Sequence, residues 1–333
     1  MRVLTYRIPA RWDGRTVEAF LRQGHGFSAR ILHDMKESPT GMLRDGEHIR
    51  SVDRLREGDV LRLELPEEEK EGLCPSEIRV PIIYEDEDII VYDKPADMPS
   101  HPAKRYQQDT LANVYAADWL RKNGGEAAPI FRPVNRLDRN TTGLVIAAKH
   151  PYAASRLGGQ VEYNRMLKRG ETPSGKALQV EKMYLALASG VFTETEGEIE
   201  LPIRRLNEQS TLRIVPQDGN GQYALTRYRV LAQGENAALL QVQIKTGRTH
   251  QIRVHFAHLG HPLLGDELYG GDCSLMQVQM LRCCQLSFSH PVTEEAMVLR
   301  APLSDEMEKT AAACGISLSD AEKRMLPDLF SVE

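Results

Sequence analysis

Residues Pro133 to Lys149 read P-V-N-R-L-D-R-N-T-T-G-L-V-I-A-A-K, a stretch with three distinct parts. The first part, N-R-L-D-R, places one carboxylate, Asp138, between two guanidiniums. The N-T-T-G that follows has the composition of a tight turn. The apolar run L-V-I-A-A at 144–148 predicts a short buried strand. We therefore expect Asp138 on a tight loop that a core strand anchors, which is a common setting for functional groups.

The spacing around Asp138 allows two interpretations. An aspartate between arginines is commonly a solvated ion pair or a turn cap. The stretch also closely resembles the catalytic motif of the RluA-type pseudouridine synthases, H-R-L-D-x-x-T-S-G-L, with Asn135 and Thr142 in place of the motif's His and Ser. The matching residues are Arg136, Leu137, Asp138, Thr141, Gly143 and Leu144. The resemblance implies that Asp138 is the catalytic carboxylate.

Other stretches resemble blocks of the same family in the same order, so that the resemblance covers roughly Ile82 to Leu303. The first block, K-P-x-x-x-x-x-H-P, contains Lys94 and His101, which we assign to structure or RNA contact and not to chemistry. Val180 to Gly190 predicts a strand and matches K-x-Y-x-A-L. A lone tyrosine in a strand is usually a core residue. The resemblance implies instead that Tyr184 lies against the target base, with its hydroxyl near the reacting sugar.

Thr246 to Leu264 reads T-G-R-T-H-Q-I-R-V-H-F-A-H-L-G-H-P-L-L and resembles the family block G-R-T-H-Q-I-R-V-H-x-A-x-x-G-x-P. Its apolar residues fit either an alternating strand or a helix that Thr249 caps and Gly260 ends. The resemblance favours the helix and makes Arg253 the partner of Asp138. No Cys or carboxylate accompanies the histidines at ligand spacing, so we do not expect a zinc site. These histidines are His250, His255, His258 and His261.

Residues 1–66 look like a small separate domain. Apolar spacing at 15–21 and 31–35 predicts two short helices, the second N-capped by Ser28. Asp45-Gly46 predicts a hairpin, and the alternation at 60–65 predicts a strand. This order resembles an S4-type RNA-binding domain, with a generic α+β cap domain as the alternative. Its candidate phosphate contacts are Arg22, Arg30, Lys36 and Arg44.

The rest of the chain is expected to form a charged linker at 67–78, a catalytic domain at 79–305 and a tail at 306–333, with one helix near 319–325. The resemblance implies an α+β pseudouridine synthase fold: a mixed, largely antiparallel central sheet flanked by helices and loops. Residues 109–121 predict a helix. Basic residues at 153–176 predict an RNA-facing insertion, or else a flexible surface loop. The remaining strand patterns lie at 82–84, 89–92, 201–205, 221–231 and 239–244.

Composition limits the classes of protein that fit the 333 residues. No run of 18 apolar residues predicts a membrane span, and residues 1–10 lack a signal-peptide core, so we expect a cytoplasmic protein. The chain has five cysteines, an odd number, and no two of them form a C-x-x-C pair. This argues against a disulfide framework and against a Cys-rich zinc site. We interpret Cys283 and Cys284 as structural thiols. The net charge of the chain is −5, but the charge is unevenly distributed. Residues 121 to 190 contain twelve Lys or Arg and five Asp or Glu, and this local excess of positive charge would attract phosphates.

The family's reaction turns a uridine in RNA into pseudouridine: the N1–C1′ bond breaks, uracil rotates, and C5 bonds to C1′. The resemblance implies that Asp138 acts as a nucleophile at the sugar or as a base in an elimination. Asp138 must be ionised, which a guanidinium close by favours, and the resemblance places Arg253 there. The uridine must flip out of its helix, and Arg136 would fill the space that it leaves. Arg248 and His250 are further candidate substrate contacts.

We expect RNA as the partner, with large-subunit ribosomal RNA first and tRNA second. No metal or organic cofactor is expected, because the reaction has no redox step and transfers no external group. We expect a monomer without membrane attachment. Two other functions are considered: a non-catalytic RNA-binding or assembly factor on a synthase scaffold, and a nucleoside-directed N-glycosidase, which would release free uracil.

Overall fold

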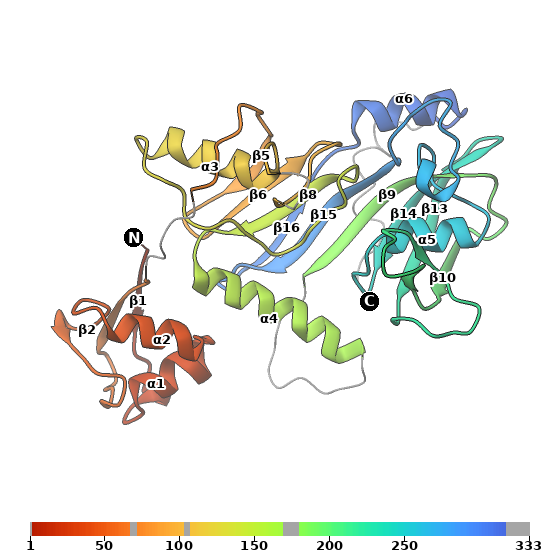
Figure 1. Cartoon of the computed structure of the whole chain (residues 1–333). Coiled ribbons are helices and arrows are strands. Elements are labelled where there is room, and N and C mark those ends of the chain that lie inside the picture. The colour runs from red at the N-terminus through yellow and green to blue at the C-terminus, as the bar shows by residue number, and fades with distance from the viewer. Residues whose placement is uncertain (1, 67–71, 103–106, 169–179, 318–333) are drawn as a thin grey trace.

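The computed structural model describes residues 2–66, 72–102, 107–168 and 180–317. Figure 1 shows a small N-terminal part, coloured red, beside a much larger part with one long sheet. We call residues 2–66 the N-terminal module and the other described residues the main body. No helix in these ranges is long and apolar enough to cross a lipid bilayer.

The N-terminal module has a four-stranded antiparallel sheet in the order β1-β4-β2-β3. The Ser28 hydroxyl accepts a hydrogen bond from the Ile31 N–H at 3.2 Å, which confirms the predicted N-cap. Asp45 and Gly46 have φ of 50° and 90°, the positive pair that a tight hairpin turn needs. Strand β1 was not predicted. The elements are β1 (Val3–Arg7), η1 (Ala10–Trp12), α1 (Val17–Ala19), η2 (Phe20–Gly24), α2 (Ala29–Lys36), β2 (Met42–Arg44), β3 (Glu47–His48) and β4 (Val60–Glu64).

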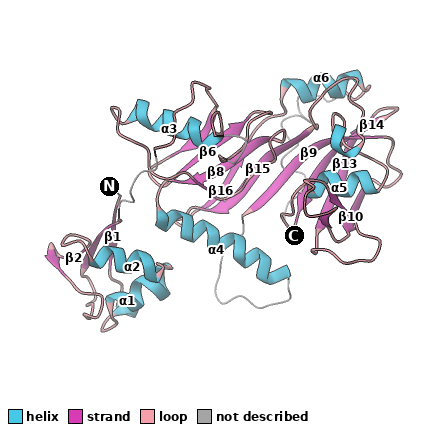
Figure 2. Cartoon of the chain, in the orientation of Figure 1, coloured by secondary structure: helices cyan, strands magenta, loops and turns pink. Residues whose placement is uncertain are grey.

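The main body is built on a ten-stranded sheet, counted over the described residues, in the order β10-β13-β14-β9-β15-β8-β6-β5. Strand β16 pairs with β15, and β7 pairs with β8. Only β8 and β15 run parallel within this part of the chain, so the expected mixed, largely antiparallel sheet is confirmed (Figure 2). The strands are β5 (Ile82–Glu85), β6 (Ile89–Lys94), β7 (Arg132–Pro133), β8 (Thr142–Ala148), β9 (Glu181–Ser189), β10 (Glu196–Glu200), β13 (Leu225–Gln233), β14 (Ala237–Ile244), β15 (Leu281–Ser289) and β16 (Ala296–Arg300).

Helices cover both faces of the sheet. Tyr184 of β9 shares a core cluster with Phe256 of α5. The next residue, Leu185, shares another with Met307 of α6. Because successive strand residues point to opposite faces, α5 and α6 lie on opposite sides of β9. The helices are α3 (Leu111–Lys122), α4 (Pro151–Lys168), α5 (Gln251–His258), η3 (Glu267–Tyr269) and α6 (Asp305–Ala313).

Several sequence expectations need correction. The residues interpreted as an RNA-facing insertion form helix α4 up to Lys168, because Ala153 and Leu157 are buried in the main core; residues 169–179 lie outside the described ranges. The predicted strand at 201–205 is reduced to β11 (Arg204–Arg205), which pairs with β12 (Arg213–Ile214) away from the main sheet. Helix α6 was not predicted, and the helix expected near 319–325 lies outside the described residues.

Helix α5 begins one residue later than predicted. His250, and not Thr249, occupies the N-cap position, and its φ of 58° is left-handed. A left-handed backbone at a residue other than glycine is held by its surroundings. Gly260, with φ of 82°, follows the helix end as expected.

The five cysteines are free thiols. Cys283 and Cys284 are buried on β15, as the structural interpretation requires, and burial raises the pKa of Cys283 to about 12. Cys74, in contrast, is exposed and lies just after the module.

Candidate active site

The loop between β7 and β8 is tied to the sheet at both ends. The Asn135 side chain donates a hydrogen bond to the Leu144 carbonyl at 3.0 Å and accepts one from the Ile146 N–H at 2.9 Å. The residue that replaces the motif's His therefore fixes the start of the loop on β8. Gly143 has φ of 104°, and a Cβ there would lie 2.2 Å from the backbone oxygen of Cys283. Only glycine allows β8 to approach β15 this closely.

Lys94, which the sequence assigned to structure or RNA contact, is buried behind the same loop. Its ammonium donates to three backbone carbonyls, one of them the Arg139 carbonyl at 2.9 Å, directly after Asp138. Burial lowers the pKa of Lys94 to about 7, although the carboxylates of Asp138 and Asp97 act to raise it. The hydrogen bonds of Lys94 thus fix the backbone of this loop. The Lys94 amine also lies close enough to Asp138 for their charges to interact.

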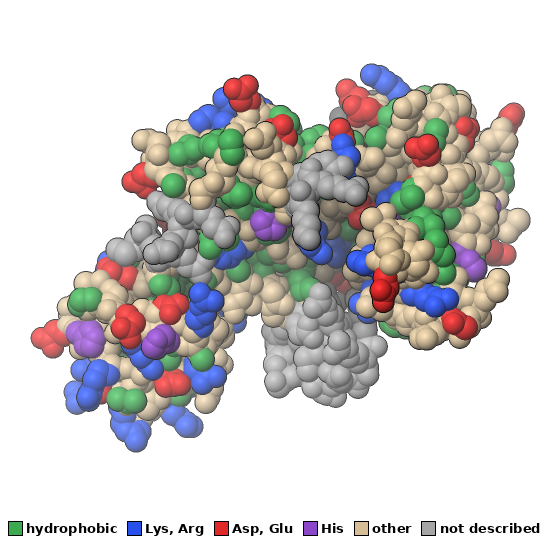
Figure 3. Space-filling view, viewed as in Figure 1, with side chains coloured by type: hydrophobic (Ala, Val, Ile, Leu, Met, Phe, Trp, Pro, Cys, Tyr) green, Lys and Arg blue, Asp and Glu red, His purple; other side chains and the backbone are tan. Residues whose placement is uncertain are grey.

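Asp138 opens onto a cavity of about 910 Å³. The loop at 133–141, β9, the end of β14 and the start of α5 form its walls, and Figure 3 shows a hollow in the main body lined with Lys and Arg side chains. Cations outnumber carboxylates among the described lining residues, which favours a polyanionic ligand. The cations are Arg136, Arg139, Lys182, Lys245, Arg248 and Arg253, and the carboxylates are Asp138 and Glu181.

Arg253 joins Asp138 to a second, buried carboxylate. Its Nε and Nη2 donate to the two oxygens of Asp266, both at 2.7 Å. Its Nη1 lies 3.5 Å from Oδ2 of Asp138. Asp266 is 1% exposed and Asp138 is 30% exposed, so Asp266 anchors the guanidinium while Asp138 stays open to the cavity. The predicted pairing of Arg253 with Asp138 is present.

His250 lies near the same oxygen of Asp138 as Arg253. Its Nε2 is 4.0 Å from Oδ2 of Asp138, and its Nδ1 is 2.8 Å from the Tyr269 hydroxyl. That hydroxyl accepts the Arg213 N–H at 3.0 Å, which leaves its own proton free for Nδ1. The Nε2–H of the neutral ring then faces the cavity. Burial lowers the pKa of His250, and Asp138 acts in the opposite direction.

The remaining predicted site residues also line the cavity. Tyr184 on β9 is 4% exposed; burial raises the pKa of its hydroxyl well above the ordinary value, and the nearby Cys283 and Asp138 raise it further. Arg136 is exposed, and its guanidinium makes no hydrogen bond or ion pair with the described residues. Arg248 donates to the Tyr223 carbonyl at 2.9 Å, which fixes it at the cavity mouth.

Sequence reasoning did not assign roles to Asp266 or Tyr269. Both fall in the stretch that follows helix α5, after the end of the quoted block at Leu264. The Tyr269 ring lies 5.0 Å from the Arg253 guanidinium carbon, and its hydroxyl contacts His250. The signal was the short distance in sequence between Arg253 and an Asp, but only the fold shows that their side chains meet.

Comparisons with known proteins show the family of this chain. Residues 88–258 match the family described as RNA pseudouridylate synthase. An uncharacterized RNA pseudouridine synthase of Bacillus subtilis is 36% identical over 285 residues, which cover 85% of this chain and 94% of the relative. The chain belongs to the RNA pseudouridine synthase family.

Other relatives support this assignment. A protein of Xanthomonas campestris named ribosomal large subunit pseudouridine synthase D is 30% identical over 321 residues, 92% of this chain and 91% of that protein. The solved structure of human RNA pseudouridylate synthase domain containing 1 is 25% identical, with a TM-score of 0.55 over 76% of this chain and 96% of the human one. As a pseudouridine synthase, the protein is an isomerase that converts uridine in RNA into pseudouridine.

Proposed function

We propose that Asp138 is the catalytic carboxylate of this synthase and acts on a uridine flipped into the cavity. One observation carries the proposal: Asp138 is open to the cavity while Arg253, held by Asp266, lies 3.5 Å from it. A cation at that distance favours the ionised form that the chemistry needs. The cavity of about 910 Å³ is large enough for a nucleotide.

The ionised Asp138 begins the reaction at the ribose. It either attacks C1′ or removes a proton from the sugar, and in both cases the electrons of the N1–C1′ bond leave with uracil. Uracil rotates and its C5 bonds to C1′. In the first case this breaks the Asp138–C1′ bond, and in the second Asp138 returns the proton to the sugar. C5 then loses its proton and N1 gains one, so that the product is an isomer of uridine and Asp138 is again a free carboxylate. Hydrolytic glycosidases commonly use two carboxylates, one of which protonates a poor leaving group. Uracil leaves more readily as an anion, so one carboxylate is sufficient here.

The other lining residues would hold the flipped nucleotide. We assign Tyr184 to one face of the base and Arg136, an exposed planar cation, to the space left in the RNA helix. Arg248 at the mouth would contact phosphate. The Nε2–H of His250 would donate to the substrate close to Asp138.

We propose large-subunit ribosomal RNA as the substrate, with tRNA as the second candidate. A relative named ribosomal large subunit pseudouridine synthase D aligns over most of the chain.

We also propose a division into an S4-like domain at 1–66, a linker, a catalytic domain at 79–305 and a tail. The candidate phosphate contacts Arg22, Arg30 and Lys36 are exposed. Arg22 and Arg30 have only surface ion pairs, at 3.4 and 3.9 Å, which cost little to exchange for phosphate. We further propose a cytoplasmic monomer, since the free thiols suit a reducing compartment.

The test is tritium release from large-subunit ribosomal RNA labelled at uracil C5. We expect the wild type to release tritium and to retain uracil in the RNA, because C5 exchanges its hydrogen for C1′. Asp138→Asn should release none, with a circular dichroism spectrum like that of the wild type. Tritium release by Asp138→Asn would falsify the assignment of Asp138, and free uracil would show hydrolysis instead of isomerisation. Release from tRNA alone would move the substrate assignment to tRNA.

A further inference from the structure

We propose that Tyr152 is a positioning residue that locks the N-terminal module onto the main body, so that RNA held by the module meets Asp138 at one fixed distance. The inference rests on the proposed RNA-binding role of the module. Tyr152 belongs to the first turn of α4 in the main body, yet it is 2% exposed within the core cluster of the module. The other buried members of that cluster all come from residues 4–65.

The Tyr152 side chain contacts the module through both its ring and its hydroxyl. The ring stacks on Phe27, with centroids 4.1 Å apart and an interplanar angle of 26°. The hydroxyl donates to the His25 carbonyl at 2.9 Å. Buried aromatic side chains dominate the energy of interfaces, and a satisfied hydroxyl gives them one orientation.

The residue between His25 and Phe27 makes the fit close. Gly26 has φ of 69°, and a Cβ there would lie 2.7 Å from Nη1 of Arg156 on α4. Arg156 is itself held by Glu294 at 2.6 Å. Three consecutive residues of the module therefore follow the surface of α4, which a loosely tethered domain would not do.

A second contact is made by the first described residue of the module, Arg2. Arg2 donates to both oxygens of Asp88, at 2.7 and 3.1 Å, and also pairs with Glu87. The Arg2 carbonyl accepts the Leu65 N–H at 2.9 Å, so Arg2 is hydrogen-bonded to the module just beyond the paired strands β1 and β4. His150, just before α4, lies 2.9 Å from Oδ1 of Asp88, the same oxygen that accepts from Nε of Arg2.

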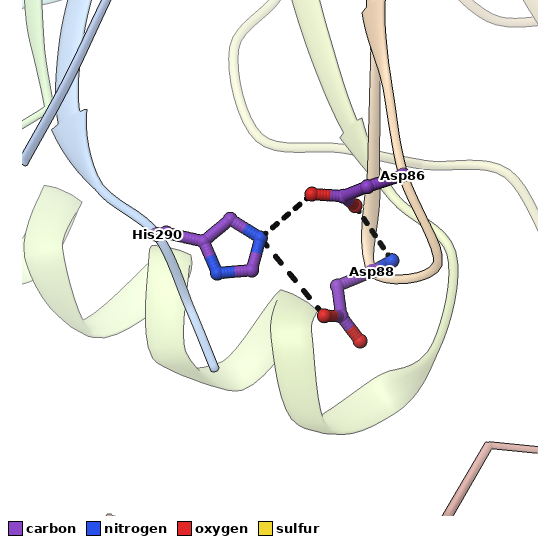
Figure 4. Close-up of side chains that lie close together, drawn as sticks. All are labelled: Asp86, Asp88 and His290. Atoms are coloured by element: carbon purple, nitrogen blue, oxygen red, sulfur yellow. Dashed lines mark hydrogen bonds and ion pairs between the residues drawn. The ribbon is translucent and has the colours of Figure 1, made fainter. Parts of the chain in front are cut away.

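Figure 4 shows the cluster of Asp86, Asp88 and His290 on which this second contact is built. By distance the three side chains could hold a metal ion. Their atoms are already used, however: Asp86 accepts from the Tyr84 hydroxyl and His290, and Asp88 accepts from Arg2. A guanidinium bound to Asp88 opposes a second cation, so the cluster fits a docking pair better than a metal site.

Two contacts on separate elements of the module prevent it from rotating. An effective concentration set by a rigid connection is higher than one set by a flexible tether, provided that the geometry matches. Uridines at the matching distance from the module's RNA site would be modified efficiently, and others would not. Tyr152 would thus determine specificity without touching the substrate.

The experiment compares full-length Tyr152→Ala, Tyr152→Phe and the double variant Arg22→Glu/Arg30→Glu with the wild type. The substrates are an unmodified large-subunit ribosomal RNA transcript and a short hairpin cut from it around the modified uridine. For Tyr152→Ala we expect KM on the transcript to rise about tenfold or more, with kcat on the hairpin within about twofold of the wild type. Tyr152→Phe keeps the stacked ring and should retain most of the wild-type KM. Solution X-ray scattering should show a larger radius of gyration for Tyr152→Ala only.

Three results would overturn the lock: wild-type kinetics of Tyr152→Ala on the transcript, an equal loss on transcript and hairpin, or an unchanged radius of gyration. The double variant separates this failure from that of the module's proposed role. If the double variant binds the transcript as tightly as the wild type does, the module does not bind RNA, and the proposed role of Tyr152 is wrong as well. If it binds weakly while Tyr152→Ala does not change KM, only the lock is wrong.

Discussion

Two clusters of carboxylates and cations are centred on Asp residues of the main body, and they differ in what the central carboxylate contacts. Around Asp88, both carboxylate oxygens accept hydrogen bonds, from Arg2 and from His150. Around Asp138, the good hydrogen bonds of Arg253 go to Asp266, and Asp138 is left with an ion pair at 3.5 Å and a path to the cavity. The residue types are the same in both places. The difference is whether the carboxylate still has room and unused acceptor capacity for a substrate.

The largest expected effect separates the two clusters by activity. Asp138→Asn should abolish turnover, because an amide neither attacks C1′ nor accepts a proton, while Asp88→Asn should keep kcat on a short hairpin within about threefold. Single-turnover kinetics with both variants measures this. A loss in Asp88→Asn equal to that in Asp138→Asn would remove the distinction between a catalytic and a docking carboxylate.

Asp266→Asn should have the next largest effect, on activity and stability together. Breaking one partner of a buried pair leaves an uncompensated charge and costs about 3–5 kcal/mol of unfolding free energy. Arg253 would also lose the contact that aims it at Asp138, so we expect kcat to fall about 100-fold, or about 2.7 kcal/mol. Urea unfolding and single-turnover kinetics give the two quantities.

The matched control is Asp93→Asn. Asp93 pairs with Arg282 at 2.7 Å, and Arg282 is also nearly buried, but neither residue lines the cavity. This variant should lose a similar amount of stability and keep its kcat. If both variants lose kcat to the same extent, the effect of Asp266 is general destabilisation and not the aiming of Arg253.

A smaller effect is expected on the unfolding free energy at acidic pH. Burial opposes the ionised form of Asp88, but the hydrogen bonds from His150 and Arg2 hold the pKa of Asp88 below its ordinary value. The stability that this provides is present above the unfolded pKa of about 3.9 and is lost as the pH falls through the lower folded pKa. The unfolding free energy of the wild type should therefore exceed that of Asp88→Asn by about 1–3 kcal/mol at pH 6, and the difference should shrink towards pH 3. A constant difference would contradict this account.

The smallest effect tests the edge of the catalytic cluster. Because His250 occupies the N-cap of α5, Thr249→Ala should change the unfolding free energy by less than about 0.5 kcal/mol. Ser28→Ala, which removes an observed cap, should cost about 1 kcal/mol. Thermal unfolding of both variants checks the pair, and equal losses would restore Thr249 as the cap.

The two clusters also show which features of a site local sequence patterns can predict. The Asp138 loop and its strand were predictable because the turn and the apolar run are local patterns. The pairing with Arg253 joins distant segments, and only the family resemblance suggested it. Asp86 and Asp88 fall between the strands predicted at 82–84 and 89–92 and were assigned no partner, since their cations come from residue 2 and from segments far along the chain.

The interface between the module and the main body could not be predicted from the sequence either, because it also joins distant segments. Tyr152 has no periodic partner in the sequence, because its apolar neighbours lie on the module. Helix α6 was missed although Ser304 caps it, since its apolar residues are few and only packing on the sheet shows which face they form.

The distribution of thiols gives the chain a practical use. Cys283 and Cys284 are sealed in β15 and resist alkylating reagents at neutral pH, whereas Cys74 is exposed where the chain enters the main body. A maleimide dye added in limited amount would therefore attach first at Cys74. Its fluorescence anisotropy would report, in real time and without further engineering, when the two parts of the enzyme move independently.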